Sequence, residues 1–178
     1  MSETTAGLAA DLAARTGGSA EESFGQWTVD VPVARWAEAL TFARDTAGCA
    51  FFDWLTGVDD GDGFRVVAHV WSIERRRHLL VRTRVPHSAP SVPTATGVYR
   101  GAAWHERETH EMFGIDFPGH PGLAPLLLPE GFEGHPLRKD FVLAARVAKA
   151  WPGAKEPGES GAPRRPAPPG VPDDWGPR

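Results

Sequence analysis

The sequence predicts an α+β fold: a two-layer sandwich in which a largely antiparallel or mixed sheet carries helices on one face. Apolar and polar residues alternate over 64–73 and 78–85, which is typical of strands with one face in water. Apolar residues recur with helical spacing over 33–47, which indicates an amphipathic helix. A segment with repeated prolines follows, and we expect an extended proline-rich arm there.

The first 25 residues are expected to form a short helix and a linker. Leu8 and Leu12 lie four residues apart within 4–15, and two glycines end this helix. The stretch 17–23 (GGSAEES) is predicted to be a linker.

Residues 26–114 are predicted to form the α+β domain. A strand over 26–31 leads into the helix over 33–47, which Gly48 ends. Three strand-like runs follow at 49–58, 64–73 and 78–85, and the stretch 101–114 is predicted to be a helix that ends at Gly114.

Residues 115–151 are predicted to be an extended partner-binding arm that closes with one or two helical turns. Five prolines exclude a long helix or a central strand: Pro118, Pro121, Pro125, Pro129 and Pro136. Without a ladder or a core of its own, the arm needs a surface, either on a partner or on its own sheet. From Pro152 to Arg178 the chain holds 8 Pro and 5 Gly in 27 residues, which predicts a disordered tail.

The composition excludes several classes of function. The chain has 178 residues, a net charge of −4 and a pI near 6.0, which argues against nucleic-acid binding. Its single cysteine, Cys49, cannot form an internal disulfide or supply the thiolates of an iron–sulfur cluster. No apolar run approaches the ~18 residues of a membrane span. We expect a cytoplasmic protein that is at most peripherally attached to a membrane.

No motif predicts a catalytic, cofactor-binding or metal site. His105 and His110 are five residues apart, so on a helix they point in different directions, unlike the zinc pair at i and i+4. The DDGDG stretch at 59–63 lacks the later ligands of a calcium loop and is interpreted as a hairpin turn. The dinucleotide and phosphate-binding glycine patterns are absent. We therefore expect no catalytic residue in this chain.

Charged residues and histidines are concentrated among the glycines and prolines of 104–141. This stretch contains ERE at 106–108, MFGI at 112–115, GHP at 119–121 and GHPLRKDF at 134–141. In this order, the motifs resemble the signature of the 30-kilodalton subunit (C) of the proton-pumping NADH:quinone oxidoreductase, complex I. The preceding order of one strand, one helix and three strands is similar to the family's domain.

The resemblance implies a cofactor-free scaffold subunit of the peripheral arm of this enzyme. Its implied partners are the quinone-site subunit (D) and the cluster-bearing subunit (B), with a third neighbour in the I subunit. These and other subunits carry the iron–sulfur clusters and flavin, and membrane contact occurs only through the complex, on its cytoplasmic side. Carried over by position, the implied interface residues are Glu106, Arg107, Glu108, Glu111, Phe113, His120, Pro121, His135, Pro136, Leu137, Arg138, Lys139 and Asp140.

Two alternatives stay open at this point. The chain is also compatible with the equivalent subunit of a related membrane-bound hydrogenase or reduced-deazaflavin dehydrogenase. A free-standing interaction module with no redox role is the alternative from another class.

Overall fold

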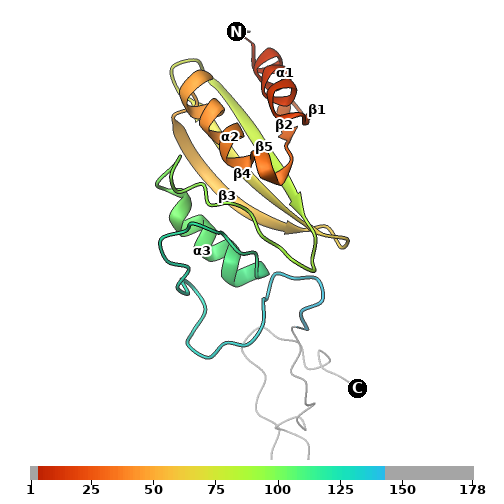
Figure 1. Ribbon diagram of the computed structural model, residues 1–178, viewed down its shortest axis with the longest axis vertical. Coiled ribbons are helices and arrows are strands. Elements are labelled where there is room, and N and C mark those ends of the chain that lie inside the picture. The colour runs from red at the N-terminus through yellow and green to blue at the C-terminus, as the bar shows by residue number, and fades with distance from the viewer. Residues whose placement is uncertain (1–3, 143–178) are drawn as a thin grey trace, which may run out of the picture. The chain divides into compact units, whose positions relative to one another are not determined.

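The computed structural model describes residues 4–142, which form three α-helices, two short helical turns and five strands (Figure 1). The element order is α1 (Thr5–Thr16), β1 (Ser19–Ser23), β2 (Gln26–Asp30), the 3-10 turn η1 (Val33–Arg35), α2 (Trp36–Thr41), the π-helical turn η2 (Phe42–Thr46), β3 (Phe51–Asp59), β4 (Phe64–Ser72), β5 (Arg77–Val85) and α3 (Ala102–Phe113).

The strands form one mixed sheet in the order β1-β2-β5-β4-β3. β2 pairs in parallel with β5, whereas the β1–β2, β3–β4 and β4–β5 pairs are antiparallel. Buried residues of β4 and β5 join residues of all three helices in a single apolar cluster. The α+β class predicted from the sequence is therefore confirmed.

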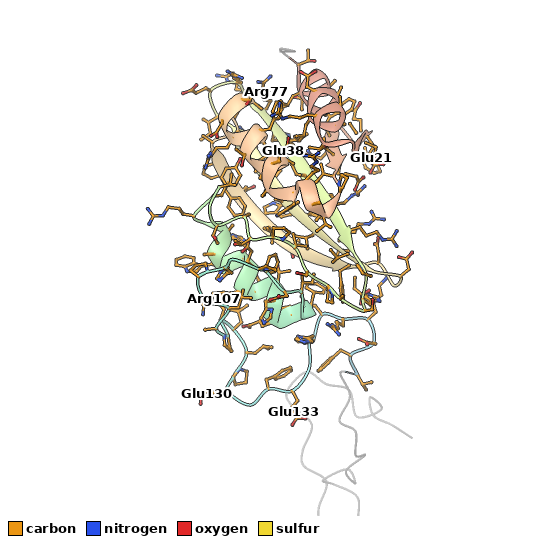
Figure 2. All side chains as sticks on the ribbon, viewed as in Figure 1. Glu21, Glu38, Arg77, Arg107, Glu130 and Glu133 are labelled. Carbon is orange, nitrogen blue, oxygen red and sulfur yellow. The ribbon has the colours of Figure 1, made fainter. Side chains whose placement is uncertain are left out.

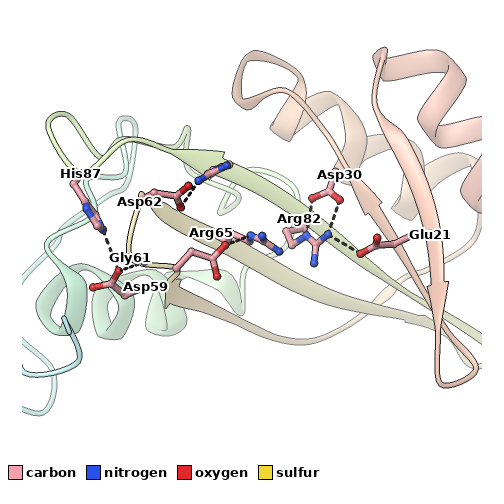
Figure 3. Close-up of polar contacts among 10 residues, drawn as sticks. Glu21, Asp30, Asp59, Gly61, Asp62, Arg65, Arg82 and His87 are labelled. Carbon is pink, nitrogen blue, oxygen red and sulfur yellow. Dashed lines mark hydrogen bonds and ion pairs between the residues drawn. The ribbon is translucent and has the colours of Figure 1, made fainter.

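Strand β1 corrects the prediction that residues 17–23 are a linker. The strand pairs with β2 through a two-residue turn in which Phe24 has φ 52° and Gly25 has φ 79°, the left-handed pair of a tight hairpin. Its residues are mostly exposed, so no alternation of apolar side chains marks it in the sequence. Arg82 of β5 donates to the carboxylates of Asp30 and Glu21, and these hydrogen bonds link the β1–β2 hairpin to β5 (Figure 3).

The helix predicted over 33–47 is divided into three kinds of turn. After η1 and α2, the chain widens into η2, where the Ala47 N–H donates to the Phe42 carbonyl at 3.0 Å. Such wide turns interrupt α-helices locally. The guanidinium of Arg44 reaches the Val98 carbonyl at 2.7 Å, which connects the wide turn to the loop before α3.

The helical face of the sheet encloses Cys49, the one thiol of the chain. Cys49 is fully buried, and its carbonyl accepts a hydrogen bond of 2.7 Å from the Tyr99 hydroxyl. Burial raises the pKa of the Cys49 thiol, although Arg77 and Arg75 oppose the rise. Both arginines also donate to the Ala47 carbonyl near the end of the preceding helical segment.

The opposite face of the sheet carries a row of aromatic and imidazole rings. Trp54 stacks on His69 and Trp71 on His78, with ring centroids 5.6 and 4.9 Å apart. Nε2 of His69 is 2.9 Å from Nδ1 of His78, and Nδ1 of His69 is 2.8 Å from the Asp53 carboxylate. Burial lowers the pKa of His78, and His69 lowers it further. This face therefore favours the neutral form of His78.

Three predictions concern residues beyond this range. The final helical turns, the end of the arm and the proline- and glycine-rich tail fall wholly or partly within 143–178, outside the described residues. Within 4–142, none of the helices is long and apolar enough to cross a membrane.

The close approach of β3 and α3 leads to a first prediction. A Cβ on Gly57 would lie 2.7 Å from Cδ2 of the buried Phe113 and 3.1 Å from the Thr109 methyl. We expect Gly57→Ala to lower the free energy of unfolding by about 1–3 kcal/mol, the usual effect of overpacking. Gly97→Ala is the matched control, because a Cβ there would meet no atom within 4 Å. Urea unfolding of both variants tests this, and equal midpoints would contradict it.

Candidate docking surface around the third helix

The carboxylate of Glu106, the first acid of the ERE motif, faces inward. It accepts hydrogen bonds from the Ala95 N–H at 2.6 Å and from the Thr94 hydroxyl at 2.5 Å. Its side chain is fully buried, and burial raises the pKa of Glu106 against the effect of these hydrogen bonds. Glu106 thus holds the loop before α3 and has no surface with which to contact a partner.

Two other charged residues of α3 hold the chain at 124–128. Arg107, which projects from α3 (Figure 2), donates from Nε to the Ala124 carbonyl at 2.8 Å and from Nη2 to the Pro125 carbonyl at 2.7 Å. Glu111 accepts from three consecutive backbone N–H groups, those of residues 126–128. Side chains of α3 therefore supply hydrogen-bond partners for backbone carbonyls and N–H groups of residues 124–128, which pair with no strand.

Glu111 is the titratable group on which this arrangement depends. Burial alone would raise its pKa, but the three N–H donors and the charge of Arg107 hold the pKa of Glu111 below its ordinary value. Consecutive amides that converge on one oxygen pair form an anion nest. The ionised carboxylate is thus the form that the fold stabilises.

Both histidines of the GHP repeats bind carbonyl groups of α3. Nε2 of His120 is 3.0 Å from the Ala103 carbonyl, while Nδ1 of His120 accepts from the Gly122 N–H. Nδ1 of His135 is 2.8 Å from the Glu111 carbonyl. Since a carbonyl only accepts, the nitrogens that face Ala103 and Glu111 carry the protons.

The second GHP repeat closes the C-terminal end of α3. The Leu137 N–H donates to the Met112 carbonyl at 3.1 Å, and Nε of Arg138 donates to the Phe113 carbonyl at 2.5 Å. The Arg138 guanidinium also lies 5.2 Å over the Phe64 ring. Gly114 has φ 71°, and a Cβ there would lie 2.5 Å from Arg138 and 2.6 Å from His135. Glycine therefore suits this position, where the Arg138 and His135 side chains pass close to the backbone.

The remaining residues implied as interface differ in their exposure. Glu108, Pro121, Lys139 and Asp140 are exposed, Pro136 is half-buried, and Leu137 is 55% exposed. Lys139 binds the domain through its backbone N–H, which donates to the Asp59 carboxylate at 2.9 Å. Exposed apolar side chains occur in the same segment: Leu126, Leu127 and Phe132.

The chain after α3 and the helix together enclose a cleft of about 350 Å³. Its walls combine apolar and polar groups: Leu123, Pro125, Leu128, Phe132, His110 and His135. Within residues 4–142, no group of three histidine, cysteine or carboxylate side chains is placed to hold a metal ion. The arrangement is suited to contact with a polypeptide and shows no catalytic constellation among these residues.

The lowered pKa of Glu111 leads to a second prediction. A carboxyl whose folded pKa is lowered adds stability that is complete above its unfolded pKa, about 4.3, and is lost as pH falls through the folded value. We expect Glu111→Gln to unfold at a lower temperature than the wild type at pH 7, with the difference shrinking below about pH 4.3. Thermal unfolding from pH 3 to 7 tests this. Glu130→Gln, at an exposed position of the same segment, is the control, and a pH-independent difference for Glu111→Gln would contradict the assignment.

Curated relatives match most of the chain. It is 40% identical over 154 residues to an NADH-quinone oxidoreductase C subunit of Caulobacter vibrioides, covering 83% of this chain and 78% of the relative. It is 42% identical over 128 residues to the C subunit of Rhizobium rhizogenes, covering 69% and 64%. An NADH-quinone oxidoreductase C/D subunit of Pseudomonas fluorescens is 44% identical over 125 residues, and the match spans 63% of this chain but only 21% of that protein.

Solved structures share the fold. A trypsin-resistant fragment of Nqo5 matches with a TM-score of 0.60 and 27% identity, over 66% of this chain and 97% of the fragment. A chain of an archaeal membrane-bound sulfane sulfur reductase matches with a TM-score of 0.65 over 78% of this chain and 85% of its own length; its 22% identity supports the fold alone. The family model of the respiratory-chain NADH dehydrogenase 30 Kd subunit matches residues 29–147. With two thirds of its length inside that match, the chain belongs to the 30-kilodalton subunit family of respiratory-chain NADH dehydrogenase.

Proposed function

We propose that the chain is the structural C subunit in the peripheral arm of a complex I-type NADH:quinone oxidoreductase. In this role it docks on the quinone-site subunit and supports an enzyme that passes electrons from NADH to quinone and translocates protons. The observation that carries the proposal is the segment 115–142, which α3 holds in place while apolar side chains face outward. Family membership supports the identity of the complex.

The held segment suits docking for an energetic reason. Ordering a backbone costs about 1–2 kcal/mol per residue, and a partner that had to order this segment would bear that cost on binding. Here Arg107 and Glu111 of α3 already fix residues 124–128. Leu126 and Leu127, which are 39% and 60% exposed, are therefore presented in a pre-organised position.

The redox groups of the proposed complex belong to its other subunits. A single buried cysteine cannot supply the thiolates of an iron–sulfur cluster. We assign the clusters and flavin to partners, with the D, B and I subunits as the neighbours of this chain. Attachment to the cytoplasmic side of the membrane then occurs through the assembled complex.

A third prediction tests this role at the outward apolar residues. Leu127→Ser is expected to change the stability of the isolated chain by less than about 0.5 kcal/mol, as exposed substitutions usually do. In cells, the same variant should reduce the share of the chain found in the intact complex on a native gel, because an interface anchor is lost. Val58→Ser is the control, since Val58 is 41% exposed on β3, outside this segment. Normal assembly of Leu127→Ser would contradict the proposal.

A fourth prediction separates two charged residues of the interface motif. Glu108 is exposed, so Glu108→Gln should leave thermal unfolding unchanged and lower assembly. Arg138→Ala should instead lower the stability of the isolated chain, because it removes the bond to the Phe113 carbonyl and the contact with Phe64.

Mass spectrometry of the proteins that co-purify with the chain identifies the complex. If hydrogenase or deazaflavin-oxidising polypeptides co-purify in a fixed ratio, the chain belongs to one of those enzymes and not to the NADH enzyme. If no partner co-purifies, the chain is a free-standing module.

A further inference from the structure

One end of the sheet is formed by two turns that lie far from the segment 115–142. The β1–β2 turn holds Phe24, and the β4–β5 turn holds residues 73–76. Since β2 and β5 are parallel neighbours, the turns that precede them lie at the same end of the sheet. The backbone of Lys139 binds Asp59, the last residue of β3, which lies at the other end.

Both turns contain a backbone conformation that their residue types disfavour. Phe24 has φ 52° and Arg76 has φ 47°, and within residues 4–142 these are the two non-glycine residues with positive φ. A large side chain in this region is uncommon because its Cβ crowds the backbone, whereas glycine or asparagine fits. Strained positions of this kind are concentrated at functional sites.

The side chains of Phe24 and Ile73 in these turns contribute little to the fold. Phe24 is fully exposed and Ile73 is 67% exposed. Trp71, near the end of β4, stacks on His78 and is still 37% exposed. The neighbouring arginines at 75 and 77 bind the Ala47 carbonyl. Among the described residues, by contrast, the Arg76 side chain has no hydrogen bond or ion pair.

We propose that Phe24, Trp71, Ile73 and Arg76 form a second protein-docking surface, the turn-end patch. Its partner is another polypeptide of the complex, which presents an apolar pocket for Phe24 and a carboxylate for Arg76. Aromatic residues and arginine are the types that most often anchor interfaces, and the exposed guanidinium sets the charge that the partner must supply. The inference rests on the proposed function, because it requires that the chain has partner subunits.

The strained backbone at Phe24 makes opposite effects on stability and on assembly expected when this residue is replaced. Glycine at position 24 relieves the backbone strain and at the same time removes the aromatic side chain that would anchor the partner. The same substitution should therefore stabilise the isolated chain and weaken its assembly. Tryptophan at position 24 keeps an aromatic anchor and the strain together.

The test uses the full-length tagged chain in cells that lack their own copy. Phe24→Gly is expected to raise the midpoint of thermal unfolding of the isolated chain by roughly 2–5 °C. Its free-to-assembled ratio on a native gel should rise about tenfold or more. Phe24→Trp should assemble as the wild type does, and Arg76→Gly should behave as Phe24→Gly does. A photo-reactive benzoylphenylalanine at position 24 should cross-link to a different polypeptide of the complex.

Normal assembly of Phe24→Gly would overturn the turn-end patch, as would a cross-link to a second copy of this chain or no cross-link. If Leu127→Ser weakens assembly and Phe24→Gly does not, only this inference fails. If the wild-type chain enters no complex, the proposed function fails as well.

Discussion

The C-terminal turn of α3 is the point on which the arrangement of the rest of the molecule depends. The last carbonyls of a helix have no partner within the helix, and here the following chain supplies them. His135, Leu137 and Arg138 donate to the carbonyls of three successive residues, Glu111 to Phe113. The chain can return to these carbonyls because Gly114 turns it sharply and leaves room for the two side chains that cross there.

The same helix joins the sheet to the segment that follows. Phe113 packs against Gly57 of β3, while Glu106 binds the loop that leads into the helix. On its other side, Arg107 and Glu111 bind the chain at 124–128. One two-layer domain therefore determines the position of a stretch that contains no strand or α-helix among residues 115–142.

The sequence alone allowed the mixed-sheet α+β class and the main strands to be predicted, because alternation over 64–73 and 78–85 follows directly from a half-buried sheet. It did not reveal β1, whose exposed residues give no alternation. The motif resemblance pointed to the candidate surface, but it could not tell which residues of the motif are buried and which are exposed. Neither spacing nor composition tells that Glu106 faces inward and Glu108 outward, since that difference depends on the loop carrying Ala95. Likewise, the carbonyl partners of His120 and His135 follow from tertiary contacts between segments far apart in the sequence.

The burial of Cys49 allows opening of the fold to be measured in solution. With a fully buried side chain and a raised pKa, this thiol has little thiolate and no access to reagents while the fold is closed. Its modification therefore requires an opening event that exposes Cys49 from the apolar core. Because the chain has one cysteine, a single chemical signal reports the free energy of that opening without an engineered label.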